Sequence, residues 1–167
     1  MDTEWMGKYH DLVHSLIAQT NIIAKKTPEK IYINSNDSIS IFSLQILEYL
    51  IENEDSSEKM IVIANRLGIK QSTFSKAVSN LTKLKLAEKY MFANNRKDII
   101  LKPTEEGKEL YNRIVEDKIS SLFQPFFKEL EDVDAETLGK IVKAINALNA
   151  ALNADSPPAK ENLIKIE

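Results

Sequence analysis

Apolar residues recur every three or four positions along most of the chain. This spacing predicts amphipathic helices over residues 3–26, 40–52 and 104–130, and a last helix from Asp134 to Leu152. Pro28 ends the first helix, Thr104 caps the third, and Pro125 is expected to kink the third helix or break it in two. β-prone runs occur at residues 87–92 and 99–102. The pattern predicts a mainly α-helical fold with one small β-hairpin.

The hydrophobic pattern between residues 57 and 86 predicts a helix-turn-helix. One helix closes over Ile63–Ile69, and the next opens at Gln71. Two helices that cross steeply need a small residue at their contact and a glycine where the chain turns back, and Ala64 and Gly68 meet these needs. The shared apolar seam is expected to contain Ile69, Phe74, Val78 and Leu81.

The outer face of the second of these helices is polar. Such a face suits a DNA major groove, whose base edges offer hydrogen-bond donors and acceptors, although many surface helices are polar without binding DNA. The residues expected on this face are Gln71, Ser72, Thr73, Ser75, Lys76 and Asn80.

A hairpin directly after such a helix is typical of the wing of a winged helix-turn-helix. We expect strands over residues 87–92 and 99–102 and a polar tip over residues 93–98. The tip contains Asn94 and Asn95, which tolerate turn geometry, followed by Arg96 and Lys97. Paired cations there can enter the minor groove or lie on phosphates; the alternative is a solvated charged loop.

Charge is unevenly distributed along the 167 residues. The chain as a whole has a net charge of −3, with 22 Lys and Arg against 25 Asp and Glu. Residues 59–102 contain ten cations opposed only by Glu88 and Asp98, so this segment carries +8 and the remainder −11. Such a local excess favours binding to the phosphates of nucleic acid.

Other classes of function find little support. The chain has no cysteine, which excludes disulfides and thiolate sites, and no glycine-rich phosphate loop or nucleophile motif. We therefore expect no enzymatic activity and no cofactor. No apolar run reaches the ~20 residues that span a membrane, and the first residues lack the pattern of a signal peptide, so we expect a cytoplasmic protein.

Two groups of side chains have a second possible use. His10 and His14 share a helix face and could hold a metal ion, but the chain has no other histidine, so we expect no metal site. Four aromatic residues could line a ligand cleft, although we favour a place in the core. They are Tyr9, Tyr32, Phe42 and Tyr111.

The terminal helices carry more apolar surface than a pair of helices covers easily, which indicates a homodimer. We expect dimerisation helices in residues 1–35 and 108–153, a DNA-binding lobe in residues 36–107, and a disordered tail in residues 154–167. The alternative is that the helices only cover each other. The apolar residues are Leu122, Phe123, Phe126, Phe127, Ile141, Ile145, Leu148 and Leu152.

These motifs together resemble the MarR (multiple antibiotic resistance regulator) family over residues 3–153. The matching segments are Ile63-Ala64-Asn65-Arg66-Leu67-Gly68-Ile69, Ser72-Thr73-Phe74-Ser75-Lys76 and Pro103-Thr104-Glu105-Glu106-Gly107. The resemblance implies a dimeric winged helix-turn-helix repressor or activator, of which we favour a repressor. It also implies a cleft, between the dimer helices and the DNA-binding lobe, where small and often aromatic anions bind and release DNA.

The chain departs from the family pattern at three places. The acidic residue and the arginine of the family's wing fall on Asn95 and Lys97, with Arg96 between them. Either Arg96 enters the minor groove after a shift of one residue, which we favour, or Lys97 contacts phosphate less specifically. Lys70 replaces a serine-like helix cap and adds a phosphate-seeking charge, and Pro103 replaces leucine.

The sequence thus predicts a homodimeric regulator that binds double-stranded DNA at a pseudo-palindromic operator and is released by a small-molecule effector. Lys70, the polar face that begins at Gln71, and Asn95, Arg96 and Lys97 are the predicted DNA contacts. Two alternatives stay open: a winged-helix module that binds another protein, and a DNA-binding protein that responds to no effector.

Overall fold

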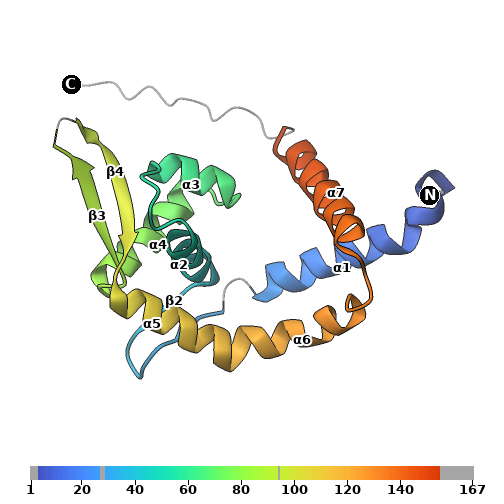
Figure 1. Cartoon of the computed structure of the whole chain (residues 1–167), viewed down its shortest axis with the longest axis horizontal. Coiled ribbons are helices and arrows are strands. Elements are labelled where there is room, and N and C mark those ends of the chain that lie inside the picture. Colours follow the sequence, from blue (N-terminus) through green and yellow to red (C-terminus); the bar gives the residue numbers. More distant parts are fainter. Residues whose placement is uncertain (1–3, 27–28, 94, 155–167) are drawn as a thin grey trace. The chain divides into compact units, whose positions relative to one another are not determined.

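The computed structural model describes residues 4–26, 29–93 and 95–154, with only the backbone of residues 4, 5 and 95–97. The predicted tail therefore lies outside the described residues from residue 155 onward. The chain forms two compact units, one ending at Ile119 and the other beginning at Ser120 (Figure 1). No helix in the described part of the chain is long and apolar enough to cross a membrane.

The core of the first unit lies between four helices and a hairpin: α2 (Ile41–Glu52), α3 (Met60–Arg66), α4 (Gln71–Lys83), α5 (Glu105–Ile114), and the strands β3 (Ala87–Phe92) and β4 (Asn95–Pro103). Ser40 caps α2 by accepting a hydrogen bond from the backbone N–H of Ser43 at 3.1 Å. Leu44, Leu47 and Leu50 of α2 are buried, as the helical pattern predicts. Because Leu110 and Ile114 of α5 are buried in the same core, α5 is part of the fold of this unit.

The predicted helix-turn-helix is confirmed. Ala64 is fully buried, and Gly68 has φ +63° at the turn, where a side chain would strain the backbone. The backbone N–H of Ile69 donates to the carbonyl of Ala64 and closes the turn. The apolar seam holds the four predicted residues, all buried: Ile69, Phe74, Val78 and Leu81.

The joint between β4 and α5 explains the Pro103–Gly107 motif. Thr104 caps α5 by accepting from the Gly107 N–H (3.0 Å), and its hydroxyl donates to the carbonyl of Lys85 (2.7 Å). A Cβ on Gly107 would lie 2.1 Å from the carbonyl oxygen of Leu86. This motif therefore fixes α5 against the end of α4, where Lys85 takes the left-handed conformation (φ 59°) usual for glycine after a helix.

Two expectations about the helices are wrong. The first helix is not continuous from Thr3, because Gly7 has a non-helical backbone that separates a 3-10 segment (Glu4–Tyr9) from α1 (His10–Lys26). The predicted 104–130 helix loses its α-geometry in a π-helical stretch, Val115–Ile119, and not at Pro125, which lies inside α6 (Ser120–Glu129).

A second small sheet was not predicted: β1 (Ile31–Tyr32) pairs with β2 (Ser38–Ile39) in antiparallel register. Its turn depends on Asn34, whose side-chain oxygen accepts from the backbone N–H groups of Asn36 and Asp37. Strands of two residues are too short to produce an alternating pattern, so the sequence contained no clear signal for them.

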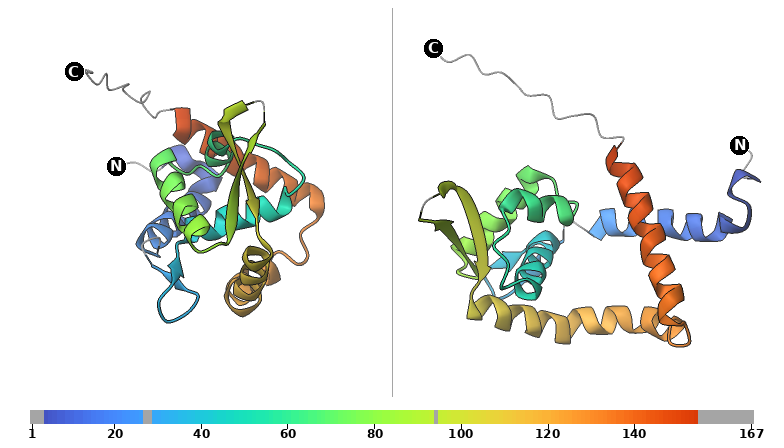
Figure 2. Two further views of the ribbon diagram at one scale, coloured as in Figure 1. Left: turned by 90° about the vertical axis from the view of Figure 1, so that its left-hand side faces the viewer. Right: turned by 45° about the horizontal axis from the view of Figure 1, so that its top comes forward.

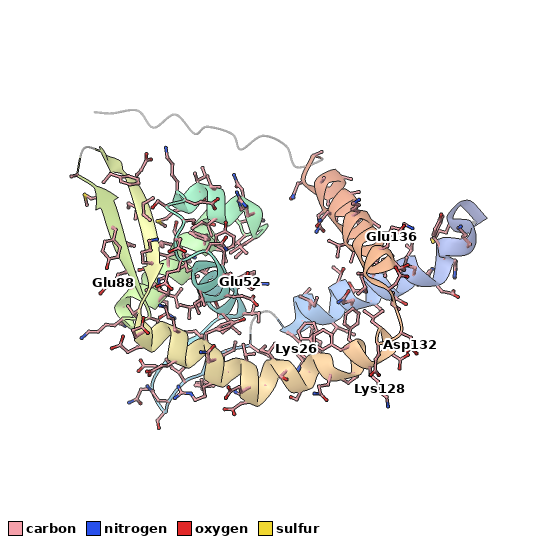
Figure 3. All side chains as sticks on the ribbon, viewed as in Figure 1. Lys26, Glu52, Glu88, Lys128, Asp132 and Glu136 are labelled. Atoms are coloured by element: carbon pink, nitrogen blue, oxygen red, sulfur yellow. The ribbon has the colours of Figure 1, made fainter. Side chains whose placement is uncertain are left out.

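The second unit comprises α6 and α7 (Ala135–Ala154). The Asp134 carboxylate caps α7 by accepting from the N–H and the hydroxyl of Thr137, and these hydrogen bonds lower the pKa of Asp134. Figure 3 shows polar side chains around the turn between the helices, among them Lys128, Asp132 and Glu136. Neither helix contains a buried residue in the described chain, so these two helices do not cover each other's apolar faces.

Candidate nucleic-acid interface

Helix α4 presents most of the predicted polar face to solvent. Gln71, Ser72, Ser75 and Lys76 are exposed, and Thr73 is half-buried. On the opposite side Phe74, Ala77, Val78 and Leu81 are buried in the core, which holds the helix in place. The first turn of α4 can therefore offer hydroxyl, amide and ammonium groups to an external partner without any loss of packing.

Asn80 differs from the other predicted contacts. Its side-chain amide donates to the backbone carbonyl of Ser38 at 2.9 Å and joins α4 to β2. Because a half-buried amide with a carbonyl partner stabilises the fold, Asn80 helps to hold α4 beside β2. Its predicted role at DNA is not tested by this geometry.

Ion pairs in the folded lobe neutralise some of the cations that give residues 59–102 their positive charge. Lys59 pairs with Asp98 at 2.8 Å, and Arg66 pairs at 2.8 Å with Glu58, which lies just outside the segment that was counted. The hydroxyl of Tyr49 also donates to Glu58 at 2.5 Å, and this hydrogen bond raises the pKa of Tyr49. Two of the ten cations therefore hold α3 in place.

The cations beside α4 differ from these, because among the described residues Lys70, Lys76 and Lys89 have no ion-pair partner. Lys70 precedes α4 and makes no side-chain cap hydrogen bond, which agrees with the sequence prediction. An exposed lysine beside a helix N-terminus, where the helix dipole is positive, adds to the attraction for an anion. The first turn of α4 is thus the part of the lobe best suited to phosphate.

The wing consists of β3 (Ala87–Phe92), which runs away from α5, and the antiparallel β4 (Asn95–Pro103), which returns to α5 (Figures 1 and 2). The predicted tip of six residues is wrong, because β4 already begins at Asn95 and pairs it with Phe92. The register then changes, since Met91 pairs with Ile99, so residues 96–98 have no partners on β3. Arg96 and Lys97 therefore belong to a bulge in β4, and Asn94 lies outside the described residues.

Lysine side chains anchor the base of the wing. Lys102 on β4 donates to the backbone carbonyls of Glu54 and Ser56, the latter at 2.7 Å. Lys108 on α5 pairs with the carboxylates of Glu54 (2.7 Å) and Glu105 (2.9 Å), and these partners raise its pKa. The base of the hairpin is therefore held to α5 and to the loop after α2.

A groove of about 590 Å³ adjoins α4, and the sequence did not predict it. It is in the size range of small-molecule sites, and it combines hydroxyl groups and two lysines with apolar wall residues. No sequence signal pointed to it, because its walls come from three separate elements and the segment before β1. Its lining includes Glu29, Lys30, Ser38, Ile39, Ser40, Phe42, Thr73, Lys76 and Asn80.

The remaining candidate residues do not form a site. His10 and His14 stack with ring centroids 4.4 Å apart, and the described residues contain no group of three or more metal-ligating side chains. Tyr9 and Tyr32 are exposed, so their predicted place in the core is wrong. Tyr111 is half-buried, and its hydroxyl donates to Glu48 at 2.7 Å; burial and this contact raise the pKa of Tyr111.

Comparison with solved structures establishes the fold. The PcaV transcriptional regulator of Streptomyces coelicolor, in complex with its natural ligand, matches with a TM-score of 0.59 at 17% identity, over 91% of this chain and 98% of PcaV. A MarR/EmrR family regulator from Acinetobacter sp. ADP1 matches with a TM-score of 0.60 at 17% identity, over 87% and 96% of the two chains. The chain has the MarR winged-helix fold.

A third solved structure with the MarR fold is the adhesin competence repressor of Streptococcus pyogenes. It matches with a TM-score of 0.56 at 16% identity, over 87% of this chain and 98% of the repressor. No family model and no curated protein matches the sequence. By their names, these three solved proteins are transcription regulators.

Proposed function

We propose that this protein is a transcription regulator that binds double-stranded DNA as a homodimer in the cytoplasm. The proposal rests on the two sides of α4. The apolar residues of its inner side are buried, and its outer side exposes four polar residues: Gln71, Ser72, Ser75 and Lys76. In a helix-turn-helix this second helix lies in the major groove, with its N-terminal residues at the base edges. The exposed Lys70 and Lys76 contact backbone phosphates, and these contacts do not depend on the DNA sequence.

A two-fold dimer supports the proposal, because it places two recognition helices one turn of DNA apart on a pseudo-palindromic operator. The surface for a second copy is available on α1, α6 and α7, which contain no buried residues in the described chain. Exposed apolar side chains occur on all three helices, for example Ile17, Phe126 and Ile145. Dimerisation would remove this surface from water.

We infer repression as the mode of regulation. A dimer that occupies a promoter blocks access to it, so repression requires DNA binding alone. The adhesin competence repressor, which shares the fold, is by its name a repressor.

The groove beside α4 is the place that we assign to a small-molecule effector. PcaV was solved with a natural ligand, which shows that a protein of this fold binds one. Lys30 and Lys76 favour an anion, and Phe42 and Ile39 offer apolar contact to its body. A ligand in this groove would contact Thr73 and Lys76 of α4, so ligand and DNA would exclude each other.

Selection from a random duplex library tests the proposal. We expect enrichment of a pseudo-palindrome whose half-sites are about 10 base pairs apart. Combining Gln71→Ala with Thr73→Ala should weaken binding to the selected duplex by about 1–3 kcal/mol and relax the preference at one position of each half-site, because these side chains face base edges. Fluorescence anisotropy with the selected duplex and with a random one measures both effects.

Lys76→Ala is expected to behave differently and weaken the two duplexes equally, with a salt slope smaller by about two per dimer. Lys140→Ala, which removes one lysine from α7, is the matched control and should leave both affinities unchanged. Full preference for the selected duplex in the Gln71→Ala, Thr73→Ala variant would contradict the assignment of α4. Absence of any enriched sequence would contradict the proposed function.

A further inference from the structure

The far end of the wing is unusually apolar for a two-stranded ribbon in water. Tyr90, Met91 and Phe92 end β3 with 51%, 58% and 45% of their surfaces exposed, and Ile99 on β4 is also exposed. At the base of the same hairpin the apolar residues Ala87, Ile100 and Leu101 are buried. Large apolar groups gathered on a projecting element indicate a surface that becomes covered on binding.

The pairing of β3 with β4 shows where each of these apolar side chains lies along the hairpin. Met91 lies opposite Ile99, and such partners place their side chains on the same face, where each covers part of the other. The Tyr90 hydroxyl donates to Glu88 at 2.5 Å, near the base of the wing (Figure 3). Phe92 is the last residue of β3, opposite Asn95, and it is the large apolar side chain nearest the end of the described ribbon.

The charges around this end favour DNA over a protein as the occupant. Arg96 and Lys97 follow Asn95 in the sequence, and Lys89 on β3 has no ion-pair partner among the described residues. Asp98, which follows Lys97 in the sequence, is paired with Lys59 at 2.8 Å. The wing also follows α4 directly and contacts it, so the same bound duplex can reach both elements.

We propose that Phe92 is a wedge that enters the minor groove of the operator and partly unstacks one base step, which bends the DNA. Apolar side chains flanked by cations act in this way in proteins that bind and bend the minor groove, with kinks of about 20–90°. A phenylalanine ring has the thickness of a base and loses its contact with water when it is inserted. The inference rests on the proposed function and adds DNA distortion to it.

The test uses the full-length protein and the duplex recovered by selection, with 2-aminopurine placed in turn at each flanking step. Wild-type protein should raise the 2-aminopurine fluorescence at one step per half-site and shorten the distance between dyes at the two duplex ends. Phe92→Ala should abolish the fluorescence rise, reduce the bend and weaken binding about tenfold. Phe92→Leu should keep most of the effect, since leucine is also an effective wedge.

Ile61→Ala is the matched control, because Ile61 is an apolar residue on α3, outside the wing, and is slightly more exposed than Phe92. It should leave fluorescence and bend unchanged. A second measurement replaces a flexible TA step at the affected position by the stiffer AA step. This should weaken wild-type binding about fivefold and leave Phe92→Ala unaffected, because the wedge requires a step that unstacks easily.

Equal fluorescence, bend and affinity for wild type and Phe92→Ala would overturn the wedge and leave DNA binding through α4 intact; this is also the result expected if the apolar end of the wing binds another protein. Failure of the proposed function is a separate result, since wild-type protein would then bind no duplex. Circular dichroism establishes that each variant is folded, and a folded Phe92→Ala that still unstacks the step contradicts the proposal.

Discussion

Replacing Ile145 and Leu148 by glutamate is expected to separate the dimer into monomers. Both residues lie on an exposed apolar stripe of α7 that repeats at positions 141, 145, 148 and 152. Burial of each aliphatic side chain contributes about 1.5–3 kcal/mol, and a two-fold dimer contains four of the replaced residues. The dissociation constant should therefore rise by more than about 10⁴-fold, before the cost of burying the new charges is added.

Sedimentation velocity over a range of protein concentrations measures this change, with wild type at twice the mass of one chain. The control is Asn146→Glu with Ala150→Glu, which adds the same two charges to the other side of α7. It should remain dimeric. The Ile145→Glu, Leu148→Glu variant should sediment at the mass of one chain; if it sediments as a dimer, the apolar stripe is not the interface.

The second large effect is expected at the joint between β4 and α5. Gly107→Ala should lower the free energy of unfolding by about 3 kcal/mol, because its Cβ would lie 2.1 Å from the carbonyl oxygen of Leu86. Backbone atoms surround this position, so α5 has to move away from Leu86, and Leu47 Cδ2 at 3.3 Å limits the movement. The unfolding temperature should fall by about 6–12 °C.

Urea and thermal unfolding followed by circular dichroism at one fixed protein concentration test this expectation. Gly139→Ala is the matched control, since a Cβ there meets nothing within 4 Å and alanine is the better helix former. That variant should be as stable as wild type or slightly more stable. Equal stability of Gly107→Ala and wild type would show that the close approach to Leu86 is not a constraint in solution.

Local features of the lobe could be predicted from the sequence because each depends on a few neighbouring residues. Gly68 turns the chain, Ala64 allows the helices to approach, and Thr104 caps α5, so a short motif is enough to locate each element. The apolar seam from Ile69 to Leu81 follows the helical period and was found in the same way.

Features that depend on distant residues were not predicted. Glu58, which lies before α3, pairs with Arg66 at the end of α3, so the charge of residues 59–102 alone overestimates the free positive charge. The wing bulge depends on how β4 pairs with β3, and a polar stretch of sequence does not reveal where that pairing resumes. The sequence predicts a helix break at Pro125, but the irregular stretch is Val115–Ile119. A helix irregularity without a proline has no strong sequence signal.

The groove beside α4 was missed for the same reason. Lys30, Ser40 and Lys76 are far apart in the sequence and come together only when β2 packs beside α4 through the Asn80–Ser38 hydrogen bond. None of the three belongs to a recognisable ligand motif. A candidate site of this kind becomes visible only in the folded chain.

Binding of wild-type protein to a random-sequence duplex at increasing salt tests the central claim most directly, because it requires no knowledge of the operator. Lys70, Lys76 and Lys97 of each subunit on phosphates, together with Arg96 in the minor groove, where it also displaces counterions, give about eight cations per dimer at the DNA. We expect measurable binding at 50 mM KCl and a slope of log affinity against log salt of about −7. No binding at 50 mM KCl, or a slope between 0 and about −1, would contradict it and favour a winged-helix module that binds another protein.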